Sequence, residues 1–132
     1  MATQYPRTVF LIVWAAFTVS IGIYVAVGLL AAPKDVEPPS QVLAALLGVI
    51  AIGLVGAGFF ARTLAWPNGT ADYESPSAQR AFGLTVVAYA LFESCGIFGL
   101  VLALLGAPPL WTIPFYVISF AAFAVSPPAP AR

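Results

Sequence analysis

Histidine is absent from this 132-residue sequence, cysteine occurs once, and charged residues make up only 8% of the chain. The single cysteine, Cys95, excludes an internal disulfide, and the lack of histidine removes the commonest metal ligand. The acids outside the long apolar runs are too scattered to suggest a metal site or an acid–base pair: Asp35, Glu37, Asp72 and Glu74. We therefore expect no metal, no cofactor and no enzymatic activity, although a role as a non-catalytic subunit of a membrane enzyme complex stays open.

Net charge is also lacking, because five Lys or Arg balance five Asp or Glu. A neutral chain gives no reason to expect a nucleic-acid partner. What the sequence has in abundance is hydrophobic residues, at 61% of the total, whereas ordinary soluble domains contain about 25% charged residues. This composition predicts a membrane protein, with the lipid bilayer as its first partner.

Long apolar runs divide the chain into four predicted spans. Runs of 18 or more apolar residues indicate transmembrane helices, and three occur at residues 8–32, 41–65 and 81–106. The first run is too long for the hydrophobic part of a signal peptide, so it is predicted to be a retained helix. A fourth run, 110–125, is shorter: at ~1.5 Å per residue it reaches about 24 Å, less than a ~30 Å hydrocarbon core.

The segments between the runs are short and rich in helix-breaking residues. Pro33 and Pro67 end the first two helices, because the residue before a proline is pushed out of the α region, and Ser40 is a predicted N-cap. No separate soluble domain fits between the runs. The prediction is one all-α polytopic membrane unit, residues 1–132, with four transmembrane helices of which the fourth is short.

The basic residues predict the orientation of these spans. With four spans, both termini and the loop between the second and third spans share one side, which holds Arg7, Arg62, Arg80 and Arg132. The opposite side holds only Lys34. Because basic residues favour the cytoplasmic side, we expect an integral membrane protein, of the bacterial inner membrane, with both termini cytoplasmic.

Glu93 lies near the middle of the third run, which is otherwise uncharged from residue 81 to residue 107. A charged group at the bilayer centre costs at least ~2.5–3.5 kcal/mol, so such residues are rare and usually functional. Protonation removes most of that cost. The sequence therefore predicts that Glu93 binds and releases a proton or another small cation. The alternative is a structural carboxyl that hydrogen-bonds to a neighbouring helix, as buried polar groups in membrane bundles do.

Small residues form a second pattern, in the second and third runs. In the second run, Ala44, Gly48, Ala51, Val55 and Gly58 follow helical spacing and make one smooth face. Such faces let membrane helices approach closely. The glycines that we predict to serve helix packing are Gly48, Gly53, Gly56, Gly58, Gly96 and Gly99.

Residues 91–101, with the sequence LFESCGIFGLV, resemble the carboxylate-bearing outer helix of the proteolipid c subunit of rotary ATP synthases. The glycine-rich second run, with Arg62 near its end, is similar to the inner helix of that family. The resemblance covers residues 44–105 and its sharp part is 11 residues long. It implies that Glu93 is the proton-binding carboxylate, that Ser94 assists it, and that the chain works in an oligomer.

The resemblance also indicates which ion Glu93 binds. In sodium-binding members of the family, a Gln on the inner helix and a Tyr one turn after the Glu complete the site. Here Phe98 stands where the Tyr would be, and the second run has no Gln apart from Gln41 at its start. A site short of neutral oxygen ligands favours a proton.

Three functions remain open from the sequence. The first is a proteolipid c-like subunit, or another component of a proton-coupled membrane complex, that works through Glu93. The second is a structural accessory subunit of a larger membrane complex. The third is a small four-helix proton-coupled exporter, although the first span, where known small multidrug exporters carry their essential Glu, holds no acid. Each requires a partner, which is either other membrane subunits or a second copy of the chain.

Overall fold

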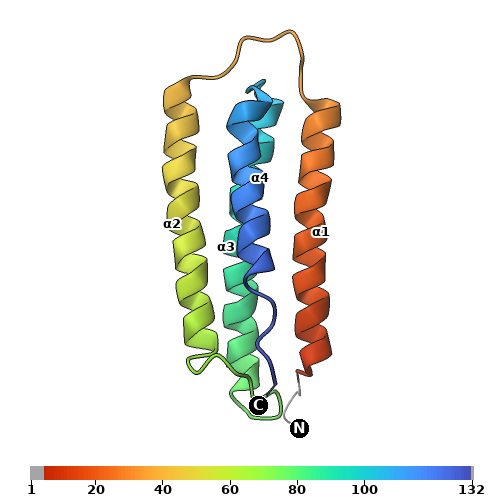
Figure 1. Cartoon of the computed structure of the whole chain (residues 1–132), viewed down its shortest axis with the longest axis vertical. Helices are drawn as coiled ribbons and strands as arrows, with labels where there is room; N and C mark the ends of the chain where they lie inside the picture. The colour runs from red at the N-terminus through yellow and green to blue at the C-terminus, as the bar shows by residue number, and fades with distance from the viewer. Residues whose placement is uncertain (1–4, 132) are drawn as a thin grey trace.

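The computed structural model describes residues 5–131, and within them the chain forms four α-helices and no β-strand. Their bounds are α1, Arg7–Ala31; α2, Gln41–Ala65; α3, Ala78–Leu104; and α4, Pro109–Ala124. The helices run up and down, so that both described ends of the chain and the α2–α3 loop lie at one end of the bundle (Figure 1). The predicted all-helical architecture is confirmed for the described residues. Met1 to Gln4 and Arg132 lie outside them.

Three helices, α1, α2 and α3, are long and apolar enough to cross a membrane, and α4 is the short one, with 16 residues. The bounds differ most from the prediction at α3, which begins at Ala78 rather than residue 81 and ends at Leu104 rather than residue 106. Gln79 and Arg80 interrupt the apolar pattern but are exposed in the first turn, where polar residues fit. At the other end, Gly106 has φ +88° and turns the chain toward α4.

Local signals explain where the other helices begin and end. The Ser40 hydroxyl accepts a hydrogen bond from the Val42 backbone N–H at 3.1 Å, which confirms the predicted N-cap of α2. Helix α1 ends at Ala31, before Pro33, as expected from the restriction that a proline places on the preceding residue. Helix α4 starts with Pro109 at its first position, where the missing N–H costs nothing.

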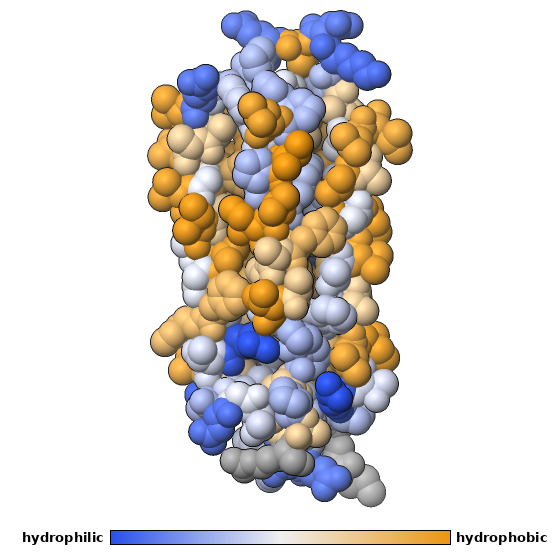
Figure 2. Space-filling view, viewed as in Figure 1, coloured by the Kyte–Doolittle hydropathy of each residue, from blue (hydrophilic) through white to orange (hydrophobic). Residues whose placement is uncertain are grey.

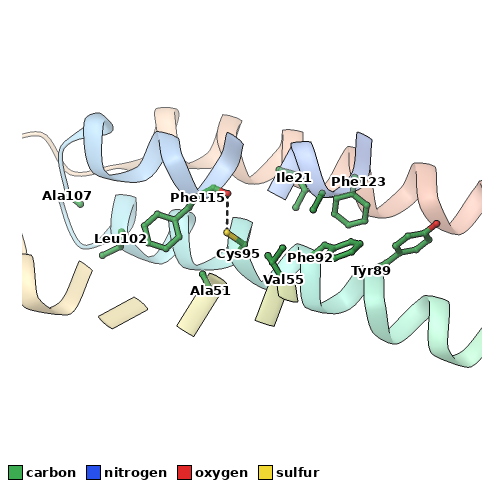
Figure 3. Packing of buried hydrophobic residues seen from close by; sticks show 11 residues of the cluster. Ile21, Ala51, Val55, Tyr89, Phe92, Cys95, Leu102, Ala107, Phe115 and Phe123 are labelled. Atoms are coloured by element: carbon green, nitrogen blue, oxygen red, sulfur yellow. Dashed lines mark hydrogen bonds between the residues drawn. The ribbon is translucent and has the colours of Figure 1, made fainter. Parts of the chain in front are cut away.

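Helix α3 is the centre of the bundle. It packs against each of the other three helices, whereas α1 and α2 make no direct contact in the described part of the chain. Its side chains form the core with those of the other three helices, including Ala51 and Val55 of α2 (Figure 3). Phe92 and Phe123 meet edge to face with ring centroids 5.7 Å apart. Two bonds to backbone carbonyls link α3 and α4: Cys95 Sγ to Phe115 at 3.3 Å and Ser119 Oγ to Phe92 at 2.8 Å.

The outer faces of α1 and α2 are apolar. Large side chains such as Leu30 and Val49 are 88% and 70% exposed, which is unfavourable in water but natural against lipid. Hydrophobic residues cover much of the visible face between the ends of the molecule, and hydrophilic residues gather at the two ends (Figure 2). This distribution suits an integral membrane protein.

The chain beyond α4 is not a free tail. Residues 125–131 leave the helix and run in an extended path to the end where the α2–α3 loop lies (Figure 1). Ser126 and Ala129 are 0% and 2% exposed. At ~3.1 Å per residue in an extended proline-rich path, this segment adds about 20 Å to the ~24 Å of α4. Helix and tail together therefore match the height of α3.

Four carbonyl groups of this tail accept hydrogen bonds from the rest of the bundle. Tyr89 Oη donates to the Ser126 carbonyl at 3.0 Å, and Arg62 Nη2 donates to the Pro127 carbonyl at 2.8 Å. Tyr73 Oη donates to the Ala129 carbonyl at 2.5 Å, and the Ala71 N–H donates to the Pro130 carbonyl at 2.9 Å. Burial raises the pKa of Tyr73, so its hydroxyl remains a neutral donor. Prolines have no N–H to satisfy. Non-helical backbone is thus tolerated here because its carbonyls are paired within the protein.

The bond from Tyr89 predicts a stability effect. Tyr89→Phe should lower the free energy of unfolding by about 1–3 kcal/mol, because the buried Ser126 carbonyl loses its donor. Tyr116→Phe is the matched control, since the buried Tyr116 hydroxyl has no hydrogen-bond partner within residues 5–131. That change should be neutral or stabilising. Thermal unfolding in detergent measures both, and equal losses would show that the tail bond contributes nothing.

Candidate functional site

Glu93 meets a partner from another helix. It lies on α3, ~22 Å from Ala78 and ~16 Å from Leu104 at ~1.5 Å per residue. The Tyr24 hydroxyl of α1 donates a short hydrogen bond to Glu93 Oε1. Both residues are half-buried, so the pair lies at the edge of the α1–α3 contact rather than in the core. No other charged residue occurs in α1, α3 or α4 except Arg7 and Arg80, which are near the helix starts.

The predicted assistant, Ser94, is not part of this pair. Its hydroxyl donates to the Ala90 carbonyl one turn earlier at 2.9 Å. Such back-bonding to the i−4 carbonyl is common for serines in membrane helices. The structure therefore brings Glu93 together with Tyr24, while Ser94 bonds to its own helix.

Sequence reasoning missed Tyr24. In sodium-binding members of the proteolipid family, the assisting tyrosine lies one turn after the carboxylate on the same helix. This chain has Phe98 at that position. A tyrosine hydroxyl is nevertheless present, and it comes from α1. A signal was available: Tyr24 is the only tyrosine in the first apolar run, and its hydroxyl needs a polar partner inside a membrane.

The six glycines predicted to serve packing fall into two groups. At three of them an added Cβ would lie under 3.0 Å from another helix: from the Phe92 ring at Gly58 (2.7 Å), from Ile21 Cδ1 at Gly96 (2.8 Å) and from Phe115 Cβ at Gly99 (2.9 Å). At Gly48 the nearest atom would be Phe115 Cζ at 3.9 Å, an ordinary contact. Gly53 and Gly56 meet no described atom within 4 Å and face outward.

Two glycines outside the predicted set also lie at close approaches. A Cβ on Gly28 of α1 would be 2.7 Å from the Tyr116 hydroxyl, which allows α1 and α4 to come together one turn beyond Tyr24. Gly106 combines its positive φ with a close approach to Val36. Single glycines in the first run and at a helix end carry no periodic pattern, so sequence reasoning did not select them.

Cavities lie at both ends of the bundle and leave Glu93 outside their walls. One of about 330 Å³ lies at the α1–α2 loop end, between Gly28, Lys34, Ala103 and Tyr116. Another, of about 230 Å³, lies at the opposite end beside Arg62 and Trp66. The Glu93–Tyr24 pair therefore lies outside both cavities, partly exposed on the side of the bundle.

The described residues contain no group of three or more His, Cys, Asp or Glu side chains that could hold a metal ion. The chain matches no protein-family model, no curated protein and no solved structure.

Proposed function

We propose that the protein is a four-span membrane subunit that binds and releases a proton at Glu93, as a component of a proton-coupled membrane complex. The observation that carries this proposal is the Tyr24–Glu93 hydrogen bond at mid-height on the edge of the bundle. A carboxyl at this depth is costly when ionised and is inexpensive when protonated. Its half-exposed position allows a partner subunit to reach it.

The tyrosine hydroxyl suits a group that changes protonation state. A phenol can both donate and accept a hydrogen bond. When Glu93 is ionised, its carboxylate accepts from Tyr24, and when it is protonated, its O–H can donate to the Tyr24 oxygen. The contact between α1 and α3 thus persists in both states, and a proton can be taken up without opening the bundle.

The proposed orientation follows from the arginines. Arg7, Arg62 and Arg80 lie at the end that holds the α2–α3 loop and both described chain ends (Figure 1). Lys34 lies in the loop at the other end, with Asp35 and Glu37. The positive-inside rule assigns the arginine end to the cytoplasm of a bacterial inner membrane. In this arrangement α4 and its tail form the fourth span.

A second candidate is a structural accessory subunit, and the same hydrogen bond favours it. Interhelical bonds in membrane bundles contribute on average ~0.6 kcal/mol. In that case Glu93 joins α1 to α3 and exchanges no proton. The proton-binding proposal and the structural one differ in whether the carboxyl titrates, which can be measured directly.

Labelling with dicyclohexylcarbodiimide tests the proposal. This reagent modifies protonated carboxyls in apolar surroundings, so Glu93 should be labelled while the exposed acids Asp35, Glu37, Asp72 and Glu74 are not. Labelling should decrease as the pH rises. Mass spectrometry of peptides locates the adduct, and an unlabelled Glu93 at every pH would favour the structural candidate.

A further inference from the structure

The smaller cavity lies where α2 ends and the tail passes. Its volume is about 230 Å³, and its lining residues are Arg62, Thr63, Trp66, Pro67, Gly69 and Ala129. They come from the last turn of α2, the α2–α3 loop and the tail. Three separate chain segments therefore form the wall of this cavity, whereas a gap between two helices would have only two.

Two of the residues that line this cavity, Arg62 and Trp66, carry side-chain N–H donors. The Arg62 guanidinium uses Nη2 to bond the Pro127 carbonyl at 2.8 Å. A guanidinium has five N–H donors, so others remain for a ligand. Trp66 is only 9% exposed. Its indole N–H is buried and has no acceptor within residues 5–131. An indole N–H can only donate, and leaving it unpaired costs about 1–3 kcal/mol.

The surroundings indicate the depth of the cavity. Phe10, Trp66 and Tyr73 pack together at this end, with ring centroids between 5.1 and 5.7 Å apart. Aromatic residues of this kind concentrate at the membrane–water interface, at the level of the lipid headgroups. The arginines at the same end favour anionic lipids of the cytoplasmic leaflet.

We propose that this cavity binds the phosphate group of an anionic phospholipid. Arg62 supplies charge and donors, since guanidinium and phosphate geometries match. Trp66 supplies an indole N–H that lacks an acceptor within residues 5–131. The cavity holds the phosphate and adjoining glycerol atoms, and the acyl chains lie along the apolar outer face of α2. The same arginine also bonds the Pro127 carbonyl, so the lipid binds where α2 meets the tail.

Native mass spectrometry of the full chain in detergent, with phosphatidylglycerol as the probe, tests this site. Arg62→Gln should weaken phosphatidylglycerol binding about tenfold, which corresponds to ~1.4 kcal/mol. Trp66→Phe keeps the aromatic packing but removes the donor, and should weaken binding by a smaller but measurable factor. Arg80→Gln is the matched control: Arg80 lies at the same end outside the cavity, and its loss should leave binding unchanged.

Three results would overturn the proposal. An equal loss in Arg80→Gln would show general attraction of anionic lipid rather than a site. Phosphatidylcholine bound as tightly as phosphatidylglycerol would contradict selection for an anion. Displacement of the lipid by inorganic phosphate would assign the site to soluble phosphate. If Arg62→Gln fails to fold, Trp66→Phe alone decides, because it leaves the Pro127 bond in place. None of these measurements depends on Glu93.

Discussion

Glu93→Gln is expected to abolish proton binding in the membrane part of this protein while leaving its fold nearly unchanged. The amide of glutamine occupies nearly the same volume, and its oxygen still accepts the hydrogen bond from Tyr24. It cannot release a proton at ordinary pH. Infrared difference spectra recorded between two pH values should show the carbonyl stretch of a protonated carboxyl in the wild type and lose it in the variant. Any proton-coupled activity of the host complex should be lost with it.

Two further variants separate proton binding from structural bonding. Glu93→Leu removes the acceptor for Tyr24 and should lower the stability of the bundle by about 0.6 kcal/mol, and at most ~1.7 kcal/mol. Tyr24→Phe should cost a similar amount but keep the infrared signal, since the carboxyl remains. If Glu93→Gln retains full activity in the host complex, the proton-binding function is wrong and the structural role remains.

The second large effect concerns glycine contacts. Gly99→Ala should destabilise the bundle by about 1–3 kcal/mol, because the new Cβ would lie 2.9 Å from Phe115 Cβ and 3.0 Å from the Tyr116 ring. Phe115 Cβ is attached directly to the backbone, so α4 must shift to make room. Gly58→Ala should behave similarly, since its Cβ would approach the Ala88 carbonyl at 3.0 Å. Gly96→Ala should cost less, because the atom it meets is the far end of Ile21.

Gly53→Ala and Gly56→Ala are the matched controls within the same predicted set. Neither Cβ would meet a described atom within 4 Å, and alanine is favoured over glycine in a helix by up to ~1 kcal/mol. Both variants should therefore be neutral or stabilising as isolated chains in detergent. Thermal unfolding followed by circular dichroism ranks all five variants. A loss of stability at Gly53 or Gly56 would contradict the arrangement in which these positions face outward.

The extent of the helices was predictable because their determinants are local. The ends of α1 and α2 were predicted from the apolar runs, Pro33 and the Ser40 cap. They agree with the structure to within one residue. The prolines at the start of α4 mark the turn between α3 and α4, whereas the predicted third span still included Gly106, at which the chain already turns. The exposed Gln79 and Arg80 show the limit of this approach, because an apolar run does not include the polar first turn of a helix.

The sequence by itself determined that this chain forms apolar helices, where α1, α2 and α4 begin and end to within a residue, and that a lone carboxyl lies at mid-height in the third, since composition and chain breaks act locally. Only the tertiary structure decided that Tyr24 is the partner of Glu93, and that Gly58, Gly96 and Gly99 are in close contact while Gly53 and Gly56 face outward. It also decided that Ser126, Pro128 and Ala129 of the proline-rich tail are buried. These features depend on the rotation of each helix about its axis and on which helices become neighbours. Packing of the other three helices around α3 sets both, and no segment encodes them alone.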